Sequence, residues 1–237
     1  AALAITSVGA GLATSIGVAG DFQQKMAGVN AIVGGSAADM QTLEAAARQA
    51  GATTQFSASQ AADALGFMAG AGWSVQDSTT ALNDTLMLAA AGGLDLAQAG
   101  DLMTNTVAQF GLEATDAGRV ANVLAAGASA TNTSVSELGA GMGQVGALAN
   151  TFGIGLESTT AALGTLSNAG IKGAEGGTAL RGVLASLANQ SGPAAAELAK
   201  MGLTADDLNP SMHSLGEIFG TLQAHGMTAA QALKIFG

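Results

Sequence analysis

Two histidines are the side chains whose charge changes most readily near neutral pH, so the search for chemistry starts with them. His213 and His225 do not fall in an HExxH pattern, the spacing of a zinc-binding helix. Cysteine is absent, so it supplies no metal ligand, nucleophile or disulfide. No GxSxG nucleophile elbow is present either. We interpret both histidines as surface or helix-end residues and predict no metal site.

A glycine pattern typical of dinucleotide sites is the next candidate. Residues 141–146, GMGQVG, match GxGxxG. The dinucleotide interpretation needs a strand before the motif and a helix that begins at it. Here a helical pattern already begins at Ser134, so we interpret the match as chance in a chain with 35 glycines. There is no Walker A sequence, and we predict no cofactor.

The remaining candidates have structural interpretations. Asp206 and Asp207 open a predicted helix, where negative charge is favourable against the helix dipole. Glu137 and Glu157 also occur at predicted helix starts. The single tryptophan, Trp73, is interpreted as a packing anchor between two helices, with an exposed partner-binding ring as the alternative. The sequence therefore predicts no catalytic residue and no enzyme activity.

The elements that position these residues begin with one repeated device. A Ser or Thr is followed three residues later by an acid or amide, and then by an apolar pattern of helical spacing. In such a capping box, the hydroxyl and the later side chain each accept a bond from the other residue's backbone N–H. The pairs are Ser36/Asp39, Ser57/Gln60, Ser74/Asp77, Ser134/Glu137, Thr204/Asp207, Ser214/Glu217 and Thr228/Gln231.

Helix interiors and helix ends agree with these starts. Apolar residues step by three or four and draw one stripe on each helix. Two such stripes are Leu96, Ala99, Met103, Val107, Phe110 and Val135, Leu138, Met142, Val145, Leu148, Phe152. Glycine stops are predicted at Gly72, Gly92-Gly93, Gly111, Gly153 and Gly170. No stretch alternates with the period of a strand. The prediction is an all-α fold of many short helices, a quasi-repeat of roughly 17–21 residues per helix and turn.

Residues 1–20 contain no charged side chain. The stretch is long enough to span a bilayer, although its Gly, Ala, Ser and Thr content makes insertion marginal. We favour an apolar Gly/Ala-rich helix buried against protein and keep a membrane-active segment as the alternative. The chain lacks an initiator Met and a basic signal region, so we expect it to be a fragment of a longer protein. The predicted domains are 1–20, a core of helical quasi-repeats at 21–192, and trailing short helices at 193–237.

Charge and side-chain size set the expected partners. Seventeen acidic against seven basic residues give a net charge of −10, and the basic residues are scattered, which argues against nucleic-acid binding. Aromatics make up only 3% of the chain, so helices must approach closely to bury area. Small-residue pairs at Gly66/Gly70, Gly139/Gly143 and Gly216/Gly220 are expected at such helix crossings, and we expect self-association.

Several long phrases in this order resemble the conserved core of bacteriophage tail tape-measure proteins, over about residues 20–190. They are GATTQFSASQAADALGFMAGAGW (51–73), LAAAGGLDLAQAGDL (88–102), FGLEATDAGRVANVLAAGASATNTSVSELG (110–139) and GIGLESTTAALGTLSNAGIKGAEGGTALRGVL (153–184). The sequence departs from the family where Gly139, Gly141, Gly143 and Gly146 stand in one helix. That departure predicts support from a partner chain or a segment that refolds easily.

The resemblance implies a structural role in the virion. Such proteins occupy the tail tube lumen as multiple copies, set tail length during assembly, and leave through the tail tip when DNA is delivered. Tail tube and tip proteins are the implied partners, and some relatives contact the host membrane. A continuous helix of this length would reach about 355 Å, and the glycine stops argue against such a rod here. We therefore expect the measuring stretch to lie mainly elsewhere. The alternatives are a pore-forming helical protein and a helical-repeat binding module.

Overall fold

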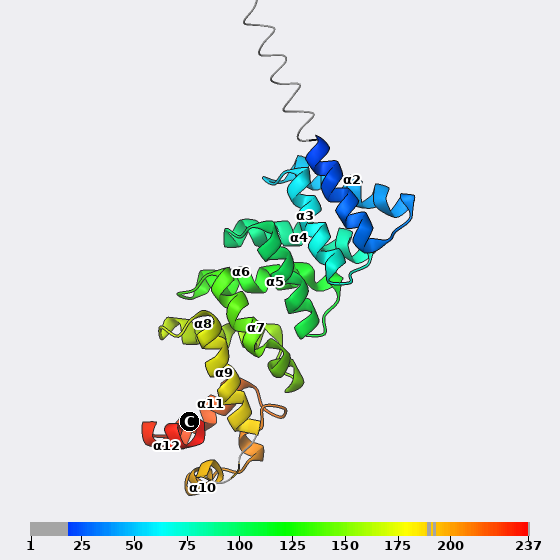
Figure 1. The fold of residues 1–237 in the computed structure, drawn as a ribbon. Coiled ribbons are helices and arrows are strands. Elements are labelled where there is room, and N and C mark those ends of the chain that lie inside the picture. Colours follow the sequence, from blue (N-terminus) through cyan, green and yellow to red (C-terminus); the bar gives the residue numbers. More distant parts are fainter. Residues whose placement is uncertain (1–18, 189–190, 192, 237) are drawn as a thin grey trace, which may run out of the picture. The chain divides into compact units, whose positions relative to one another are not determined.

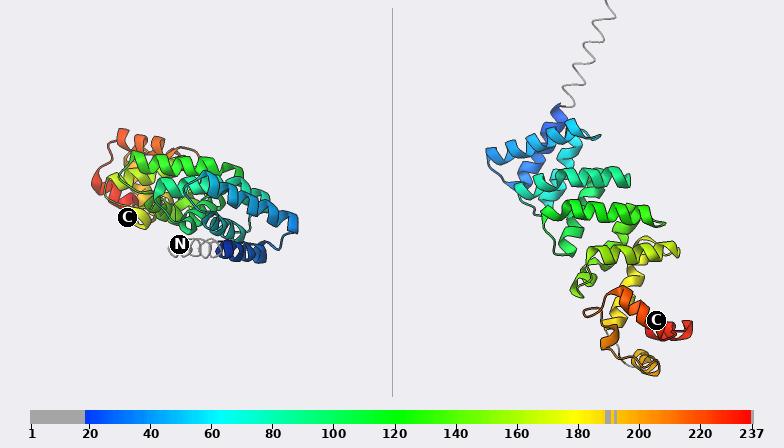
Figure 2. Two further views of the ribbon diagram at one scale, coloured as in Figure 1. Left: turned by 90° about the horizontal axis from the view of Figure 1, so that it is seen from above. Right: turned by 180° about the vertical axis from the view of Figure 1, so that it is seen from behind.

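The computed structural model describes residues 19–188, 191 and 193–236. These residues form helices and turns with no strand among them, which confirms the predicted all-α class. Figures 1 and 2 show the helices as short rods joined by tight connections. The predicted apolar helix at 1–20 falls almost entirely outside the described residues.

The helices have the following bounds. They are residues 19–33, α2 (Ala37–Thr53), α3 (Ala58–Gly70), α4 (Val75–Gly92), α5 (Leu96–Gln109), α6 (Ala117–Ala130), α7 (Val135–Thr151), α8 (Leu156–Asn168), α9 (Gly173–Ala188), α10 (Pro193–Lys200), α11 (Leu215–Ala224) and α12 (Ala229–Phe236), with 3-10 turns η1 (Ala114–Asp116) and η2 (Asp206–Leu208).

The predicted capping pairs all form their reciprocal bonds. At α7, for example, the Glu137 N–H donates to the Ser134 hydroxyl at 3.1 Å, and the Ser134 N–H donates to the Glu137 carboxylate at 2.9 Å. One prediction was wrong in its consequence. Thr204 and Asp207 close their box around the 3-10 turn η2 and do not open an α-helix.

Helix ends follow an equally regular rule. The predicted stops all contain a glycine of positive φ, which at the double glycine is Gly93. The next residue is apolar, and its N–H reaches back five residues to a helix carbonyl, as from Trp73 to Met68 at 3.0 Å and from Ile154 to Ala149 at 2.9 Å. This Schellman geometry satisfies carbonyls that would otherwise be free. In most of these connections the residue after the apolar one starts the next helix, so the connection takes about three residues.

The chain divides into two compact units, residues 1–104 with 113–121 and residues 105–112 with 122–237. In the described part of the first unit, Phe22, Leu43, Leu65 and Leu86 are core residues, and the Arg48 guanidinium lies 4.4 Å from the centre of the Phe22 ring. The predicted domain boundaries at residues 20 and 192 stay predictions.

Within the first unit, alternate helices pack on one another at close range. A Cβ at Gly100 of α5 would lie 3.1 Å from Phe67 of α3, and one at Gly118 of α6 would lie 3.2 Å from Asp84 of α4. Burial raises the pKa of that Asp84 carboxyl. The contacting residues are roughly 35 apart in sequence, the length of one helix–turn–helix unit in repeat proteins.

The second unit has the same pairing of alternate helices. Gly127 of α6 meets Thr160 of α8, and four residues on in both helices Thr131 meets Gly164, where an added Cβ would lie 2.8 Å from the threonine. Both contacts advance together along the chain, so α6 and α8 run parallel here. The Asn132 N–H donates to the Asn168 side chain at 2.8 Å, which extends the contact.

The glycine-rich helix α7 is explained by its crossing with α9. A Cβ at Gly177 would overlap the backbone of Gly141, coming within 2.8 Å of its Cα. Gly146 is similarly restricted, since its Cβ would lie 3.2 Å from the Phe110 ring, whereas Gly143 has open space. The support that the sequence led us to expect from a partner chain is thus present within this chain.

The small-residue pairs expected at crossings were the wrong ones. Among the described atoms, nothing lies within 4 Å of a Cβ added at Gly70, Gly143, Gly216 or Gly220. A Cβ at Gly66 reaches only Val29, at 3.8 Å. These positions do not mediate close helix approach within either unit.

The α7–α9 crossing yields a stability prediction with a matched control. Gly177→Ala places a methyl group inside the backbone of α7 and should lower the free energy of unfolding by about 1–3 kcal/mol. Gly182→Ala changes the same helix where nothing lies within 4 Å, and should raise stability by up to about 1 kcal/mol through helix propensity. Denaturant unfolding followed by circular dichroism measures both. Equal effects of the two variants would contradict a crossing that depends on Gly177.

Candidate functional site

The residues first considered for chemistry lie far from any catalytic arrangement. His225 is the C-cap of α11, exposed, with its Nδ1 2.9 Å from the Thr221 carbonyl oxygen. His213 lies just before the Ser214 cap of the same helix. Within the described residues, no three His, Cys, Asp or Glu side chains are grouped so that they could hold a metal ion. Both histidines occupy the helix-end positions that the sequence indicated.

The GxGxxG match lies inside α7, which starts at Val135. Gly141 and Gly146 face neighbouring helices, and Gly143 is exposed. No strand precedes the motif and no helix begins at it, so the geometry that cradles a pyrophosphate is not formed. Packing between helices accounts for two of its three glycines.

The other single residues also serve helix ends. Trp73 is half-buried, and its N–H closes the end of α3 on Met68. Glu137 completes the α7 cap, and bonds from Ser134 and Thr133 lower the pKa of its carboxyl. Glu157 lies in the first turn of α8, whose N-cap is Gly155.

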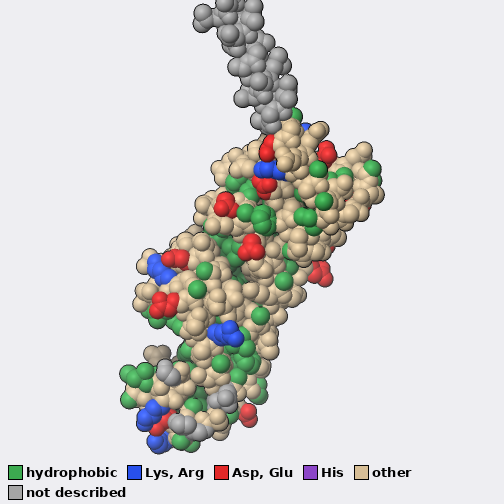
Figure 3. All heavy atoms as spheres, viewed as in Figure 1, with side chains coloured by type: hydrophobic (Ala, Val, Ile, Leu, Met, Phe, Trp, Pro, Cys, Tyr) green, Lys and Arg blue, Asp and Glu red, His purple; other side chains and the backbone are tan. Residues whose placement is uncertain are grey.

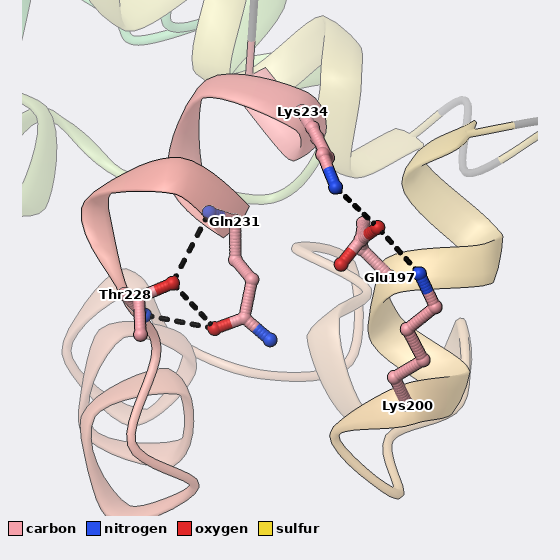
Figure 4. A network of polar contacts seen from close by, with 5 residues as sticks. All are labelled: Glu197, Lys200, Thr228, Gln231 and Lys234. Carbon is pink, nitrogen blue, oxygen red and sulfur yellow. Dashed lines mark hydrogen bonds and ion pairs between the residues drawn. The ribbon is translucent and has the colours of Figure 1, made fainter.

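A three-residue charge cluster joins α10 to α12 (Figure 4). The ammonium groups of Lys200 and Lys234 both donate to one carboxylate oxygen of Glu197, each at 2.8 Å. The Glu197 side chain is only 8% exposed, while the lysines are 65% and 55% exposed. These two hydrogen bonds lower the pKa of the Glu197 carboxyl. Next to the cluster, Thr228 and Gln231 cap the start of α12.

Sequence reasoning missed this cluster. The spacing of Glu197 and Lys200 on one helix was a local signal for an ion pair. Lys234 carries no such signal, because only the folding of α12 back toward α10 brings it to Glu197. The cluster fixes one helix to another and presents no reactive group.

An apolar groove of about 600 Å³ lies on the surface of the second unit. Its lining comes from α8, α9 and the start of α11, and contains no charged side chain. On α8 the lining residues are small, among them Ser158, Ala161 and Ala162, and Phe219 of α11 is 41% exposed at its edge. The groove offers contact surface to an apolar helix and no acid, base or nucleophile beyond hydroxyls.

A smaller hollow of about 360 Å³ in the first unit lies between residues 19–33 and α3. Exposed Ile32 and Phe67 line it beside an ion pair in which Lys25 donates to Asp63 at 2.7 Å. That bond raises the pKa of the Lys25 ammonium. The face drawn in Figure 3 shows acidic and basic side chains scattered singly over a mostly uncharged surface.

None of the described helices combines the length and the apolar character needed to cross a bilayer. The membrane-active alternative for residues 1–20 concerns positions that lie almost wholly outside the described part of the chain. The described residues define a helical-repeat protein whose conspicuous features are contact surfaces between helices.

Comparison with known proteins identifies the family. The profile of the phage-related minor tail protein family matches residues 44–237. The chain is 35% identical over 232 residues to the "Tape measure protein" of Pneumococcus phage Dp-1, covering 93% of this chain. It is 28% identical over 206 residues to the "Probable tape measure protein" of Escherichia phage P2, covering 86% of this chain. The chain therefore belongs to the phage-related minor tail protein family, as the tape-measure resemblance indicated, and is a structural protein of the phage tail.

The match covers a small share of each relative. The chain spans 20% of the length of the Dp-1 protein and 25% of the P2 protein. No solved structure matches the chain significantly.

The charge cluster predicts acid-sensitive docking of α12. Because the fold lowers the pKa of Glu197, ionised Glu197 stabilises the docked helix above the ordinary glutamate value of 4.5 and loses this effect as pH falls through the folded value. Glu197→Gln should lower the hydrogen-exchange protection of α12 amides at neutral pH, and flatten its dependence on acid. Asp101→Asn, at an exposed carboxylate on α5, is the control. Unchanged α12 protection in Glu197→Gln would show that apolar contacts alone hold the helix.

Proposed function

We propose that this chain is a segment of a tape-measure protein that occupies the lumen of the phage tail tube, sets tail length during assembly and is released at DNA delivery. The observation that carries the proposal is the similarity to the Dp-1 tape measure protein over nearly the whole chain. The P2 relative and the all-α fold support it. The proposed partners are further copies of the protein, tail tube and tail tip proteins and, during infection, the host envelope.

The charge of the chain supports a place in the lumen without DNA binding. A net charge of −10 repels the phosphate backbone that passes through the same space. The seven basic residues provide no continuous track for phosphates, and several are already paired with carboxylates. We propose a lining or filling role with no specific contact to nucleic acid.

We further propose that the segment has no catalytic activity. Support comes from the positions of the candidate residues, which cap helices or fill crossings. Both histidines lie at the ends of one short helix, and the GxGxxG match is part of a helix interior. The family assignment to a structural tail protein agrees with this proposal.

The folded helices also bear on how length is measured. The longest fully described helix, α4, has 18 residues and is about 27 Å long. A ruler made of one continuous helix would have to lie outside this segment. We propose that the measuring stretch lies elsewhere in the protein and that this segment is a folded module attached to it.

Self-association needs a different test from the one that the sequence suggests. Leu138 and Val145 share a stripe, and replacing both by lysine would be the obvious way to remove a contact face. Both residues are buried in the second unit at 1% and 0% exposure, so that double variant would unfold the module. Self-association remains a proposal, and its contact face must lie on the exposed surface.

The lumen and release proposals are tested in virions of the phage that encodes the chain. Peptides from residues 44–237 should resist an added protease in intact virions and should disappear from tails after triggered DNA ejection. Mass spectrometry before and after ejection measures both. The tube protein, which stays in place, is the internal control. Digestion in intact virions would contradict the lumen, and retention after ejection would contradict release.

The length proposal makes a separate prediction. An in-frame deletion in a predicted helical stretch outside this chain should shorten tails by about 1.5 Å per residue removed. A short Gly-Ser insertion at Gly170, in the connection between α8 and α9, should leave tail length unchanged. Electron microscopy of tails gives both lengths. A tail that lengthens with the insertion would place the measuring function within this module.

A further inference from the structure

One side of α8 shows how helices of the second unit recognise each other. Thr160 and Gly164 lie one turn apart on α8 and meet Gly127 and Thr131 of α6, so a small residue on each helix accepts the larger one opposite. These α8 residues are buried. The crossing therefore depends on small uncharged residues four apart on both helices.

The opposite side of α8 has the same chemistry without a full partner. Ser158, Ala161, Ala162 and Thr165 lie along it at helical spacing and line the apolar groove. Residues two apart on a helix point in nearly opposite directions, at about 100° per residue, so this stripe is distinct from the buried one. Three of the four are exposed and Ala162 is half-buried.

The walls of the groove restrict what can fill it. Ala179, Leu180 and Val183 come from α9, and exposed Phe219 stands at the α11 edge. No charged side chain is available to pair with a charge on an occupant, and an unpaired charge buried there would be costly. The groove fits an uncharged helix that presents small and aliphatic side chains.

The chain contains such a segment outside its described part. Eighteen residues precede the start of the described structure at residue 19, and none of them is charged. Ile5, Val8, Leu12 and Ile16 step by three and four, as on one face of a helix. Gly9 and Ala13 are four apart, matching the small residues that mediate the α6–α8 crossing.

We propose that residues 1–18 bind in the groove between α8, α9 and α11, packing small residues against the outer stripe of α8. The aliphatic residues of the segment fill the space beside Val183 and Phe219. The binding site is thus a second use of the small-residue crossing, and the inference is independent of the proposed function in the tail.

Cysteine cross-linking tests the contact in the whole 237-residue chain. Because the chain has no cysteine, introduced thiols are the only reactive ones. Val8→Cys with Ala161→Cys should give a linked peptide pair with a short bismaleimide, detected by mass spectrometry. A link within one chain and a link between two chains both place the segment in the groove. The matched control is Val8→Cys with Ala147→Cys, at an exposed residue of α7 away from the groove.

A second variant blocks the groove while keeping both thiols. Adding Ala162→Arg to the Val8→Cys/Ala161→Cys chain should reduce the cross-link to the level of the control pair and speed thermolysin cleavage within residues 1–18. Ala147→Arg should do neither, and circular dichroism confirms that both chains stay helical. Equal linking of the two thiol pairs, or cleavage that ignores Ala162→Arg, would overturn the proposal. Vesicle binding by residues 1–18 without groove cross-linking would also overturn it, in favour of a membrane role.

Discussion

Helices made largely of alanine, leucine and glycine bury sufficient surface only when their backbones come very close. Every crossing described in the second unit meets that constraint with a missing or minimal side chain, most directly where Gly177 of α9 lies against Gly141 of α7. The cost is considerable, since each interior glycine weakens its helix by roughly 1 kcal/mol relative to alanine. At the α6–α8 crossing, close packing also leaves the Thr160 hydroxyl buried without a hydrogen-bond partner among the described atoms. Close contact outweighs these local losses, because short helices gain most of their stability from tertiary packing.

The connections between helices make those crossings recur. A left-handed glycine ends the helix, the following apolar residue closes the Schellman bond, and a capping residue starts the next helix almost at once. With helices of similar length and connections this short, a residue and its contact on the next helix but one stay roughly 35 positions apart. Gly100 meets Phe67 in the first unit and Gly141 meets Gly177 in the second at nearly the same offset. Local capping chemistry thus sets the spacing of nonlocal contacts.

This division between local and nonlocal effects decides what the sequence predicted. Helix starts such as Ser134/Glu137 and stops such as Gly153 depend on residues within five positions, and they were placed correctly. The crossing glycines were not. Gly66/Gly70 and Gly139/Gly143 have the same spacing in the sequence as true contact residues, and only the fold reveals which glycines face a helix. Lys234 was unpredictable for the same reason, since its partner Glu197 is 37 residues away. The groove is a gap between three helices, so no local pattern marks it.

The same architecture bears on the proposed passage of the protein through the tail. Each helix is held by a few close contacts, and its ends are satisfied by residues of its own connections, so its hydrogen bonds need little help from distant parts of the chain. Separating two helices therefore exposes mainly small side chains and leaves caps such as Ser214/Glu217 intact. A chain built in this way can lose its tertiary contacts in steps while its helices remain capped. A core of large interlocking aromatic residues would instead have to open all at once. For a protein that is proposed to pack in a narrow tube and later leave it, low aromatic content and abundant glycine are consistent with that use.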